Sequence, residues 1–272
     1  MTFPAVLIVA LASAEVRLQP GQARPGDVVL VEVSGSEKAP SGQLGSAELV
    51  FLPFGDRWLA LTGLAVEAKP GERALHVVAG EEQIDGALEV LHEQFRRRQL
   101  TVSKRFTSIS KKDKQHSAND QRAFAAATDR DFDAWTFRGD FAWPRNDEVG
   151  APFGDLRLFN GKKKSQHFGT DIDGSTGDPI YAANDGEVVM VRDCFASGNT
   201  VLVHHGGRLF TAYFHMSKFE VKEGQQVKRG ELLGLVGKTG RVTGPHLHFG
   251  VKLDGKWVNA ESLLRLSMSP AE

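Results

Sequence analysis

The stretch His246-Leu247-His248-Phe249-Gly250-Val251 alternates polar and apolar side chains before it turns apolar. On a β-strand, side chains two residues apart point the same way, about 7 Å from each other. His246 and His248 therefore share one face, and Leu247 and Phe249 share the other. The alternation predicts a strand that offers two imidazoles to a site and two apolar groups to a core, although a His-x-His pair alone is equally typical of an exposed strand.

Short apolar runs of the same kind recur through the second half of the sequence. Outward from the first stretch, they occupy residues 185–191, 200–204, 209–213 and 232–236. Glycine turns separate them, in keeping with the 29 glycines of the chain, and no βαβ pattern accompanies them. The pattern predicts an all-β domain over residues 139–272.

The first part of the chain shows an even spacing of short apolar runs between turns. The runs are residues 28–31, 49–52, 58–61 and 74–78, and the breaks carry Pro-Gly, Gly-Asp and Pro-Ser-Gly sequences. Such spacing is typical of a small β-sandwich, and we predict an immunoglobulin-like one over residues 15–105. We see no catalytic chemistry in it.

Residues 106–138 differ in composition and are predicted to be a linker with one helix. Ser117 as a cap and the run Ala125–Ala127 favour a helix over about residues 118–131. The lysines of this region and Arg96-Arg97-Arg98 before it could contact an anionic polymer. Solvated linker charge is the simpler interpretation.

Length, charge and cysteine content exclude several classes of protein. The chain has 272 residues, enough for two domains, with 41% hydrophobic and 25% charged residues. Its 33 basic and 34 acidic side chains give a net charge of -1, so no overall field attracts nucleic acid or an anionic membrane, and we expect no nucleic-acid partner. A lone cysteine, Cys194, excludes an internal disulfide and a cysteine zinc site.

The first residues resemble an export signal. An apolar run from Phe3 to Ala12 is followed by Ala12-Ser13-Ala14, so we predict a signal peptide over residues 1–14 and export, to the periplasm first and the extracellular space second. The run is too short to span a bilayer, and no other stretch could, so we expect no membrane span. Pro4 and the lack of a preceding basic residue depart from the usual signal, and a buried N-terminal strand is the alternative.

Four histidines and one aspartate lie in three segments that could meet around one metal ion. His167 and Asp171 would be about 13 Å apart on a straight strand, so the chain must bend, and Gly169 would permit the bend through backbone angles closed to other residues. His215 should share a face with Tyr213. Two imidazoles and a carboxylate are a common donor set for catalytic zinc, and two spare histidines suit proton transfer.

These motifs resemble the lysostaphin-type (LytM-type) zinc metallopeptidases, which cut peptide cross-links in bacterial cell walls. The resemblance covers about 110 residues, from Phe153 to about Leu264. It includes Phe153-Gly154-Asp155-Leu156-Arg157, His167-x-x-x-Asp171, Asp178-Pro179-Ile180-Tyr181-Ala182, Asp185-Gly186-Glu187-Val188, Tyr213-x-His215, Gly237-Lys238-Thr239-Gly240 and Gly244-Pro245-His246-Leu247-His248-Phe249.

The resemblance implies a role for each of five residues. His167, Asp171 and His248 would bind one zinc ion per chain, and His215 and His246 would assist a zinc-activated water, with the general base between them undecided. His204 and His205 are given no role. The implied substrate is the peptide stems of peptidoglycan, with D-alanyl-diaminopimelate cross-links first and glycine bridges second.

Other functions stay open beside the peptidase. Some members of the resembled family have lost their metal site and act as non-catalytic regulators of other cell-wall hydrolases, so regulation is the main alternative, and a self-inhibited enzyme is another. The N-terminal domain could contact the catalytic groove as a lid, bind the wall or serve only as a scaffold. Protein regulators are possible partners.

Overall fold

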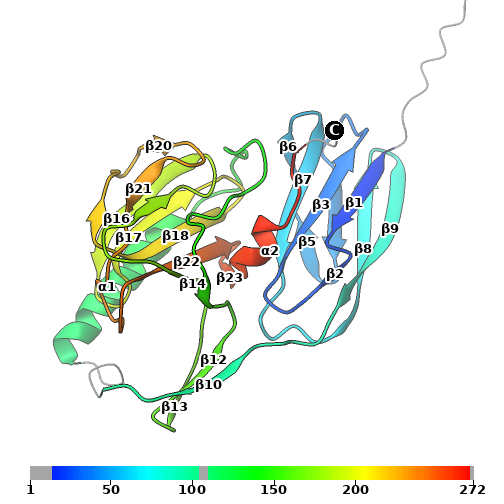
Figure 1. Cartoon of the computed structure of the whole chain (residues 1–272). Helices are drawn as coiled ribbons and strands as arrows, with labels where there is room; N and C mark the ends of the chain where they lie inside the picture. Colours follow the sequence, from blue (N-terminus) through cyan, green and yellow to red (C-terminus); the bar gives the residue numbers. More distant parts are fainter. Residues whose placement is uncertain (1–13, 104–109, 270–272) are drawn as a thin grey trace, which may run out of the picture.

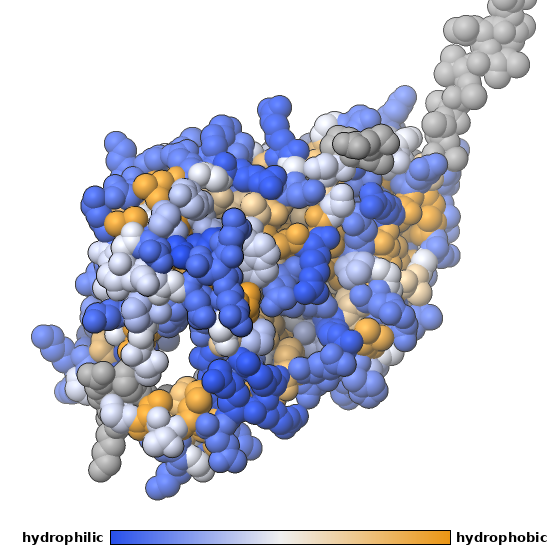
Figure 2. All heavy atoms as spheres, in the orientation of Figure 1, coloured by the Kyte–Doolittle hydropathy of each residue, from blue (hydrophilic) through white to orange (hydrophobic). Residues whose placement is uncertain are grey.

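The structure, a computed structural model, describes residues 14–103 and 110–269 (Figure 1). The expected signal peptide lies outside the described residues except for Ala14. Strands dominate and only two helices occur in the described ranges, which confirms the all-β expectation. Neither helix has the length and apolar character needed to cross a membrane. The visible face of the molecule is mostly hydrophilic, with apolar side chains in small groups (Figure 2).

The N-terminal part consists of two sheets that share a core. One sheet has the order β1 (Glu15–Gln19), β3 (Val28–Ser34), β7 (Arg57–Gly63) and β6 (Leu52–Phe54). The other has the order β2 (Gln22–Ala23), β9 (Glu82–Val90), β8 (Gly71–Ala79), β4 (Ser41–Leu44) and β5 (Ala47–Leu49). Val29 and Val31 from the first sheet pack with Leu75 and Leu88 from the second. Two sheets around one core are a sandwich, and the immunoglobulin-like detail stays a prediction.

Strand β3 is buried on both faces, and this joins the two parts of the molecule. Val29 and Val31 point into the sandwich core, whereas Val28 and Leu30 belong to the large cluster that fills the C-terminal part. A strand covered on both sides is expected to read as a continuous apolar run, as residues 28–31 do. The same run therefore serves two cores.

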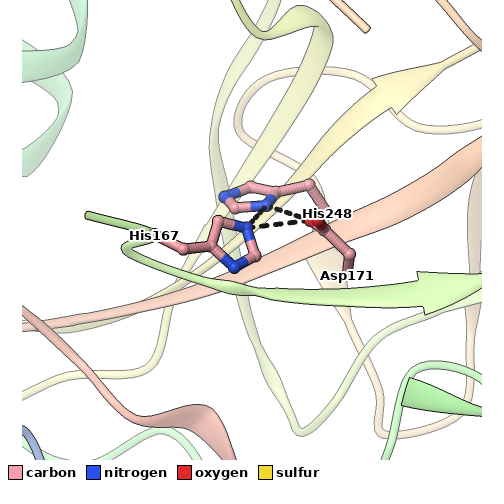
Figure 3. A group of neighbouring side chains, drawn as sticks. All are labelled: His167, Asp171 and His248. Carbon is pink, nitrogen blue, oxygen red and sulfur yellow. Dashed lines mark hydrogen bonds and ion pairs between the residues drawn. The ribbon is translucent and has the colours of Figure 1, made fainter. Parts of the chain in front are cut away.

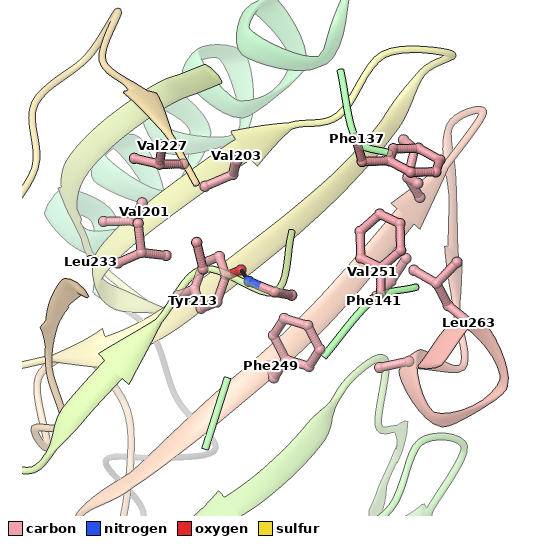
Figure 4. Packing of buried hydrophobic residues seen from close by; sticks show 14 of the residues in the cluster. Phe137, Phe141, Val201, Val203, Tyr213, Val227, Leu233, Phe249, Val251 and Leu263 are labelled. Atoms are coloured by element: carbon pink, nitrogen blue, oxygen red, sulfur yellow. Dashed lines mark hydrogen bonds between the residues drawn. The ribbon is translucent and has the colours of Figure 1, made fainter. Parts of the chain in front are cut away.

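The C-terminal part is built on an eight-stranded antiparallel sheet. Its strands are β11 (Val149–Ala151), β14 (Thr170–Asp173), β22 (His246–Leu253), β18 (Leu209–Met216), β17 (Gly198–His204), β16 (Gly186–Cys194) and β20 (Gln226–Val227) in that order, with β23 (Lys256–Val258) beside β22. Tyr213, Phe249 and Val251 fill the core on one face (Figure 4). The period of two that predicted a core from Leu247 and Phe249 is confirmed by their complete burial.

Two three-stranded sheets complete this part. One contains β15 (Pro179–Tyr181), β21 (Leu232–Leu235) and β19 (Lys218–Phe219), and the other contains β10 (Arg97–Leu100), β12 (Leu156–Phe159) and β13 (Lys163–Gln166). A short helix, α2 (Ala260–Leu264), follows β23. Strand β10 runs parallel to β12. The chain that leaves the sandwich thus joins the hairpin β12–β13 before it reaches the linker (Figure 1).

Helix α1 covers Lys111–Thr128, so the expected start at residue 118 with Ser117 as the cap is wrong. Ser110 is the cap, and its side chain accepts a hydrogen bond from the backbone N–H of Asp113. Ser110-Lys111-Lys112-Asp113 and Ser117-Ala118-Asn119-Asp120 both have the Ser-x-x-Asp spacing of a helix start, so this signal fits either serine. Tertiary contacts decide between them, because the Asp120 carboxylate accepts from Arg192 and from the backbone N–H of Phe195. The helix ends at Thr128, three residues before the expected end.

Candidate metal centre

Two of the three candidate ligands lie on neighbouring strands of the large sheet, and the third lies in the segment that leads into one of them (Figure 3). Asp171 in β14 lies directly opposite His248 in β22, and His167 precedes β14 by three residues. The His167 Nε2 atom is 2.9 Å from Asp171 Oδ1 and 2.9 Å from His248 Nδ1. His248 Nδ1 is 2.7 Å from Asp171 Oδ1. His167 Nε2, Asp171 Oδ1 and His248 Nδ1 therefore lie within 3 Å of one another, although His248 is far from the other two in the sequence.

This donor set fits a zinc ion. Tetrahedral ligands bound at about 2.0–2.1 Å lie roughly 3.3 Å from one another, so each donor atom would move outward by only a few tenths of an ångström. Two imidazole nitrogens and one carboxylate oxygen are also the ligand types that catalytic zinc uses. Three protein ligands leave a fourth position for water or substrate.

Neighbouring groups orient the ligands. The His167 ring donates from Nδ1 to the carbonyl of Pro152 at 3.0 Å, so its Nε2 carries the lone pair that points to the centre. Asp171 uses Oδ1 toward the two imidazoles, and its Oδ2 accepts a hydrogen bond from Arg157 at 3.1 Å. Arg157 thereby fixes the carboxylate plane. Its role was missed in the sequence, although it stands in the Phe153–Arg157 motif.

Electrostatics favour the protonation states that a metal needs. Burial by itself would raise the pKa of Asp171, but the adjacent imidazoles of His167 and His248 hold that pKa well below its usual range. Burial lowers the pKa of His248, although Asp171 opposes the effect. An ionised carboxylate beside neutral imidazole is the combination that binds a divalent cation.

Gly169 is required for space, and the expectation that it supplies a special backbone angle is wrong. Its φ lies outside the left-handed region that the turn glycines of this chain adopt. A Cβ atom at this position would lie 2.5 Å from His248 Cε1 and Nε2 and 2.9 Å from the carbonyl of Phe249. The backbone therefore passes directly against the imidazole of a ligand, and only glycine fits there.

His215 and His246 lie next to the three ligands and to each other. Their ring centroids are 5.1 Å apart, and His215 is 6.0 Å from the ring of His248. His215 donates from Nδ1 to the carbonyl of Thr239 at 3.0 Å, and His246 donates from Nδ1 to the carbonyl of Gly244 at 3.0 Å. Both rings therefore keep Nε2 free, and His246 Nε2 is 3.6 Å from Asp171 Oδ1. The candidate pair and the candidate ligands form one cluster.

His215 does not share a face with Tyr213, so that expectation is wrong. Tyr213 lies in the core, where its hydroxyl accepts a hydrogen bond from the backbone N–H of Ala183 at 2.8 Å. His215 has a φ of 63°, and the pairing of β17 with β18 shifts register at this point. The left-handed residue turns the imidazole out of the core. Burial and then the nearby His248 and His246 lower the pKa of His215 to about 3, which keeps the ring neutral.

A cavity of about 700 Å³ opens over the cluster. Aromatic and aliphatic side chains form much of its wall, namely Leu100, Val102, Phe159, Phe168, Phe214, Val242 and Trp257. Arg157 and Arg241 also line it, and Asp171 is the one acidic residue among the lining residues that the structure describes. The five candidate residues therefore lie in a cavity large enough for a peptide segment.

Residues 165–260 match peptidase family M23. They form an M23 peptidase domain. Peptidoglycan DD-endopeptidase ShyA of Vibrio cholerae is 48% identical over 99 residues, which are 36% of this chain and 23% of ShyA. DD-carboxypeptidase/endopeptidase Mpg of Neisseria meningitidis is 39% identical over 97 residues, 36% of this chain and 22% of Mpg. The chain thus spans less than a quarter of the length of these curated relatives.

One solved structure extends the likeness beyond the M23 domain. A crystal structure of a candidate peptidase M23 from Pseudomonas aeruginosa has a TM-score of 0.64 at 28% identity, and covers 88% of this chain and 93% of that chain. A match of that extent includes much of the N-terminal part. The match of residues 165–260 to peptidase family M23 confirms the resemblance to the lysostaphin-type family for this domain.

The arginines before the linker support the M23 domain through ion pairs. Asp155 is completely buried, and Arg96 contacts both of its oxygens at 2.9 Å while Arg98 lies at 3.8 Å. The backbone N–H of His167 donates to the carbonyl of Asp155 at 2.9 Å. Part of the basic cluster therefore holds the turn that positions His167, a partnership that the sequence pattern did not indicate.

Proposed function

We propose that the chain is a zinc-dependent endopeptidase that hydrolyses peptide cross-links of bacterial peptidoglycan. The observation that carries the proposal is the convergence of His167 Nε2, Asp171 Oδ1 and His248 Nδ1 to within 3 Å of each other, beside two further imidazoles in an open cavity. The relatives ShyA and Mpg are named as endopeptidases, ShyA as a peptidoglycan one, and this supports the same substrate.

His167, Asp171 and His248 would hold the ion, which when bound supplies a Lewis acid for the scissile carbonyl and makes water acidic enough to ionise near neutral pH. The two remaining histidines handle protons at their free Nε2 atoms. In the neutral form each ring accepts a hydrogen bond at Nε2 and so orients the attacking water. The ring that takes the proton of that water becomes an imidazolium, whose Nε2–H can then donate to the oxyanion at the carbonyl carbon and pass the proton to the leaving amine. His215 and His246 are each anchored through Nδ1, so neither ring has to reorient.

The finer specificity that we propose is the D-alanyl-diaminopimelate cross-link, with glycine bridges as the second choice. ShyA and its relatives of Vibrio cholerae are named DD-endopeptidases, which supports the first. A protein that acts on peptidoglycan works outside the cytoplasm, so export is expected, and we propose the periplasm. We also propose a signal peptide over residues 1–14, a sandwich domain over 15–105, a helical linker over 106–138 and a catalytic domain over 139–272.

A self-inhibited enzyme or a regulator of other wall hydrolases is the second candidate. One observation favours self-inhibition: Leu100, Thr101 and Val102, which precede the linker, form part of the cavity wall. The sandwich sheets themselves pack against β22, β23 and α2 through β3 and β7. A complete set of candidate ligands favours the active enzyme over a regulator without a metal.

The test is digestion of isolated peptidoglycan by the purified chain, with released muropeptides identified by mass spectrometry and zinc measured on the same sample. We expect one zinc per chain and cleavage at the D-alanyl-diaminopimelate bond. H167A, D171A and H248A should lose both zinc and activity, whereas H215A and H246A should lose activity and keep zinc. Bound zinc without any product would contradict the proposal and favour the regulator.

A further inference from the structure

The cavity contains a cation without a counter-ion. Arg157 pairs with Asp171 at 3.1 Å. Arg241 lines the same cavity, yet within the described ranges no carboxylate lies within ion-pair distance of its guanidinium. A half-buried guanidinium in an apolar wall attracts an anion strongly, because little water screens the interaction. The cavity therefore offers an anionic ligand one unsatisfied positive group.

Arg241 is held in place by contacts other than an ion pair. Its backbone N–H donates to the carbonyl of Ala196 at 2.9 Å, and its guanidinium carbon lies 5.4 Å from the ring centre of Phe195. Stacking on an aromatic ring leaves the N–H donors at the guanidinium edge free. The Phe195 ring thus serves as a platform that positions the guanidinium, and the N–H groups at the guanidinium edge stay available to bind a ligand.

Helix α1 supports this platform from outside the M23 domain. The backbone N–H of Phe195 donates to Asp120 Oδ2 at 2.8 Å, and Arg192 Nε donates to Asp120 Oδ1 at 2.9 Å. Asp120 is 9% exposed and is the one buried residue of α1. The helix therefore fixes the turn on which the guanidinium of Arg241 rests.

The loop that carries Arg241 also orients His215. The carbonyl of Thr239, two residues earlier, accepts the hydrogen bond from His215 Nδ1 at 3.0 Å. The Thr239 hydroxyl donates to the carbonyl of Met216 at 2.8 Å and accepts from the backbone N–H of Asn199 at 2.9 Å. A carboxylate bound at Arg241 would consequently lie at a fixed distance from His215 and His246.

We infer that Arg241 determines specificity by binding the free carboxylate of the diaminopimelate residue in the stem peptide. The inference rests on the proposed function and deepens it. A guanidinium binds a carboxylate through two parallel N–H···O bonds, which gives direction as well as affinity. Diaminopimelate has two amino and two carboxyl groups. In a cross-linked stem up to three of these groups form amide bonds and one carboxylate stays free, whereas the interior of a glycine bridge has none. The unpaired cation therefore favours the first class of cross-link over the second.

Steady-state kinetics on two cross-linked muropeptide dimers test the inference. The dimers differ only in amidation of the diaminopimelate carboxylate. For R241M we expect KM on the free carboxylate to rise about 10- to 100-fold, as loss of a charge-assisted hydrogen bond implies, with little change in kcat and little effect on the amidated dimer. R241K should be intermediate because it keeps the charge and loses the fork. R265M is the matched control, because Arg265 pairs with Glu261 on α2.

A binding measurement separates failure of this inference from failure of the proposed function. Fluorescence anisotropy with a labelled, uncross-linked stem tetrapeptide, free or amidated at diaminopimelate, gives two Kd values for each variant. If the wild-type chain cleaves neither dimer, the peptidase proposal fails, while tighter binding of the free peptide that R241M abolishes still supports the carboxylate site. Equal Kd values for the two peptides, or an equal rise in KM on both dimers, would overturn it.

Discussion

His215 adopts a left-handed backbone conformation, with a φ of 63°, that a side chain with a Cβ atom occupies at a cost. Strain of this kind persists where the surrounding structure enforces it, and here it turns an imidazole toward the candidate metal ligands. We expect H215G to be more stable than H215A by about 1 kcal/mol, because glycine adopts this φ freely. Both variants should keep zinc and lose activity at least 100-fold, as removal of an acid–base group implies.

Urea unfolding followed by circular dichroism, together with muropeptide digestion, checks this prediction. Equal stabilities for the glycine and alanine variants would show that the residue relaxes without strain. Retained activity in either variant would remove His215 from the proposed chemistry.

His205 is a second buried histidine, and its role is structural. It is fully buried, and its ring contacts the carbonyl of Asp185 at 2.6 Å and the Thr211 hydroxyl at 2.8 Å. Burial lowers its pKa to about 4, from the usual 6.5. The unfolded chain therefore binds a proton at a higher pH than the folded chain does, and the stability that His205 contributes is complete above pH 6.5 and falls as the pH drops toward 4.

We expect this single group to remove about 3 kcal/mol of stability between pH 7 and pH 4. Urea unfolding of the wild-type chain and of H205Q, both in EDTA so that metal release does not contribute, measures the effect. The wild-type profile should fall more steeply, although the glutamine variant starts lower because it loses a buried hydrogen bond. Parallel profiles would contradict the prediction.

The residues of the candidate site could be predicted from the sequence, but the orientation of their side chains and the close approach of the backbone could not. His246 and His248 follow from the period of two on a strand, and the long-range meeting with His167 and Asp171 came from the motif pattern. The roles of Gly169 and His215 depend on a close backbone approach and on a register shift. Neither feature leaves a pattern in the sequence, because both arise only when neighbouring strands pair.

At the level of elements, the positions of strands were easier to predict than the strands and cores with which they pair and pack. The run at residues 28–31 indicated β3, but its continuous apolar character also marked a strand covered on both faces, and that second contact was not recognised. Strand β10 has almost no apolar periodicity, since its sequence is Arg97-Arg98-Gln99-Leu100. It forms because β12 offers an open edge, and edge pairing depends on tertiary structure.

Asn160 holds the segment that follows β10. Its side chain accepts from the backbone N–H of Val102 at 2.9 Å and donates to the carbonyl of the same residue at 2.9 Å. Asn160 itself has a φ of 50°, so glycine replaces it without strain and removes only the two side-chain bonds. We expect N160G to speed amide hydrogen exchange at residues 100–103 and to raise KM a few-fold, because part of the cavity wall is released.

The exchange rates and the kinetics are measured by mass spectrometry on the same preparations. N160D is the matched control, since its carboxylate keeps the acceptor for the Val102 N–H and loses the donor. A clear rise in activity in N160G would instead show that residues 100–102 obstruct the cavity, which would favour the self-inhibited enzyme.

At the level of the whole molecule, the sandwich and the C-terminal part form one packed unit. Val28, Leu30 and Leu59 of the sandwich lie in the same buried cluster as Val251, Val258 and Leu263. Several hydrogen bonds also cross the boundary: among them, the N–H of Asn259 donates to the carbonyl of Gly26 at 2.7 Å, and the Ser262 hydroxyl accepts from the N–H of Val28 at 2.8 Å. A joint core of this kind supports a scaffold role for the sandwich more than that of a mobile lid.

Gly63 allows a direct test of this arrangement. A Cβ atom there would lie 2.5 Å from Val258 Cγ1, whereas a Cβ atom at Gly21 would meet nothing within 4 Å. Because overpacking a closed core costs about 1–3 kcal/mol, we expect G63V to lower the stability of the whole chain by that amount and G21V to leave it nearly unchanged. Unfolding should remain a single transition in both variants, since the buried cluster that holds Val28, Leu30 and Leu59 is complete only when both parts are folded. Calorimetry that resolved two transitions, with only the first displaced by G63V, would show that the sandwich unfolds separately and could move over the cavity.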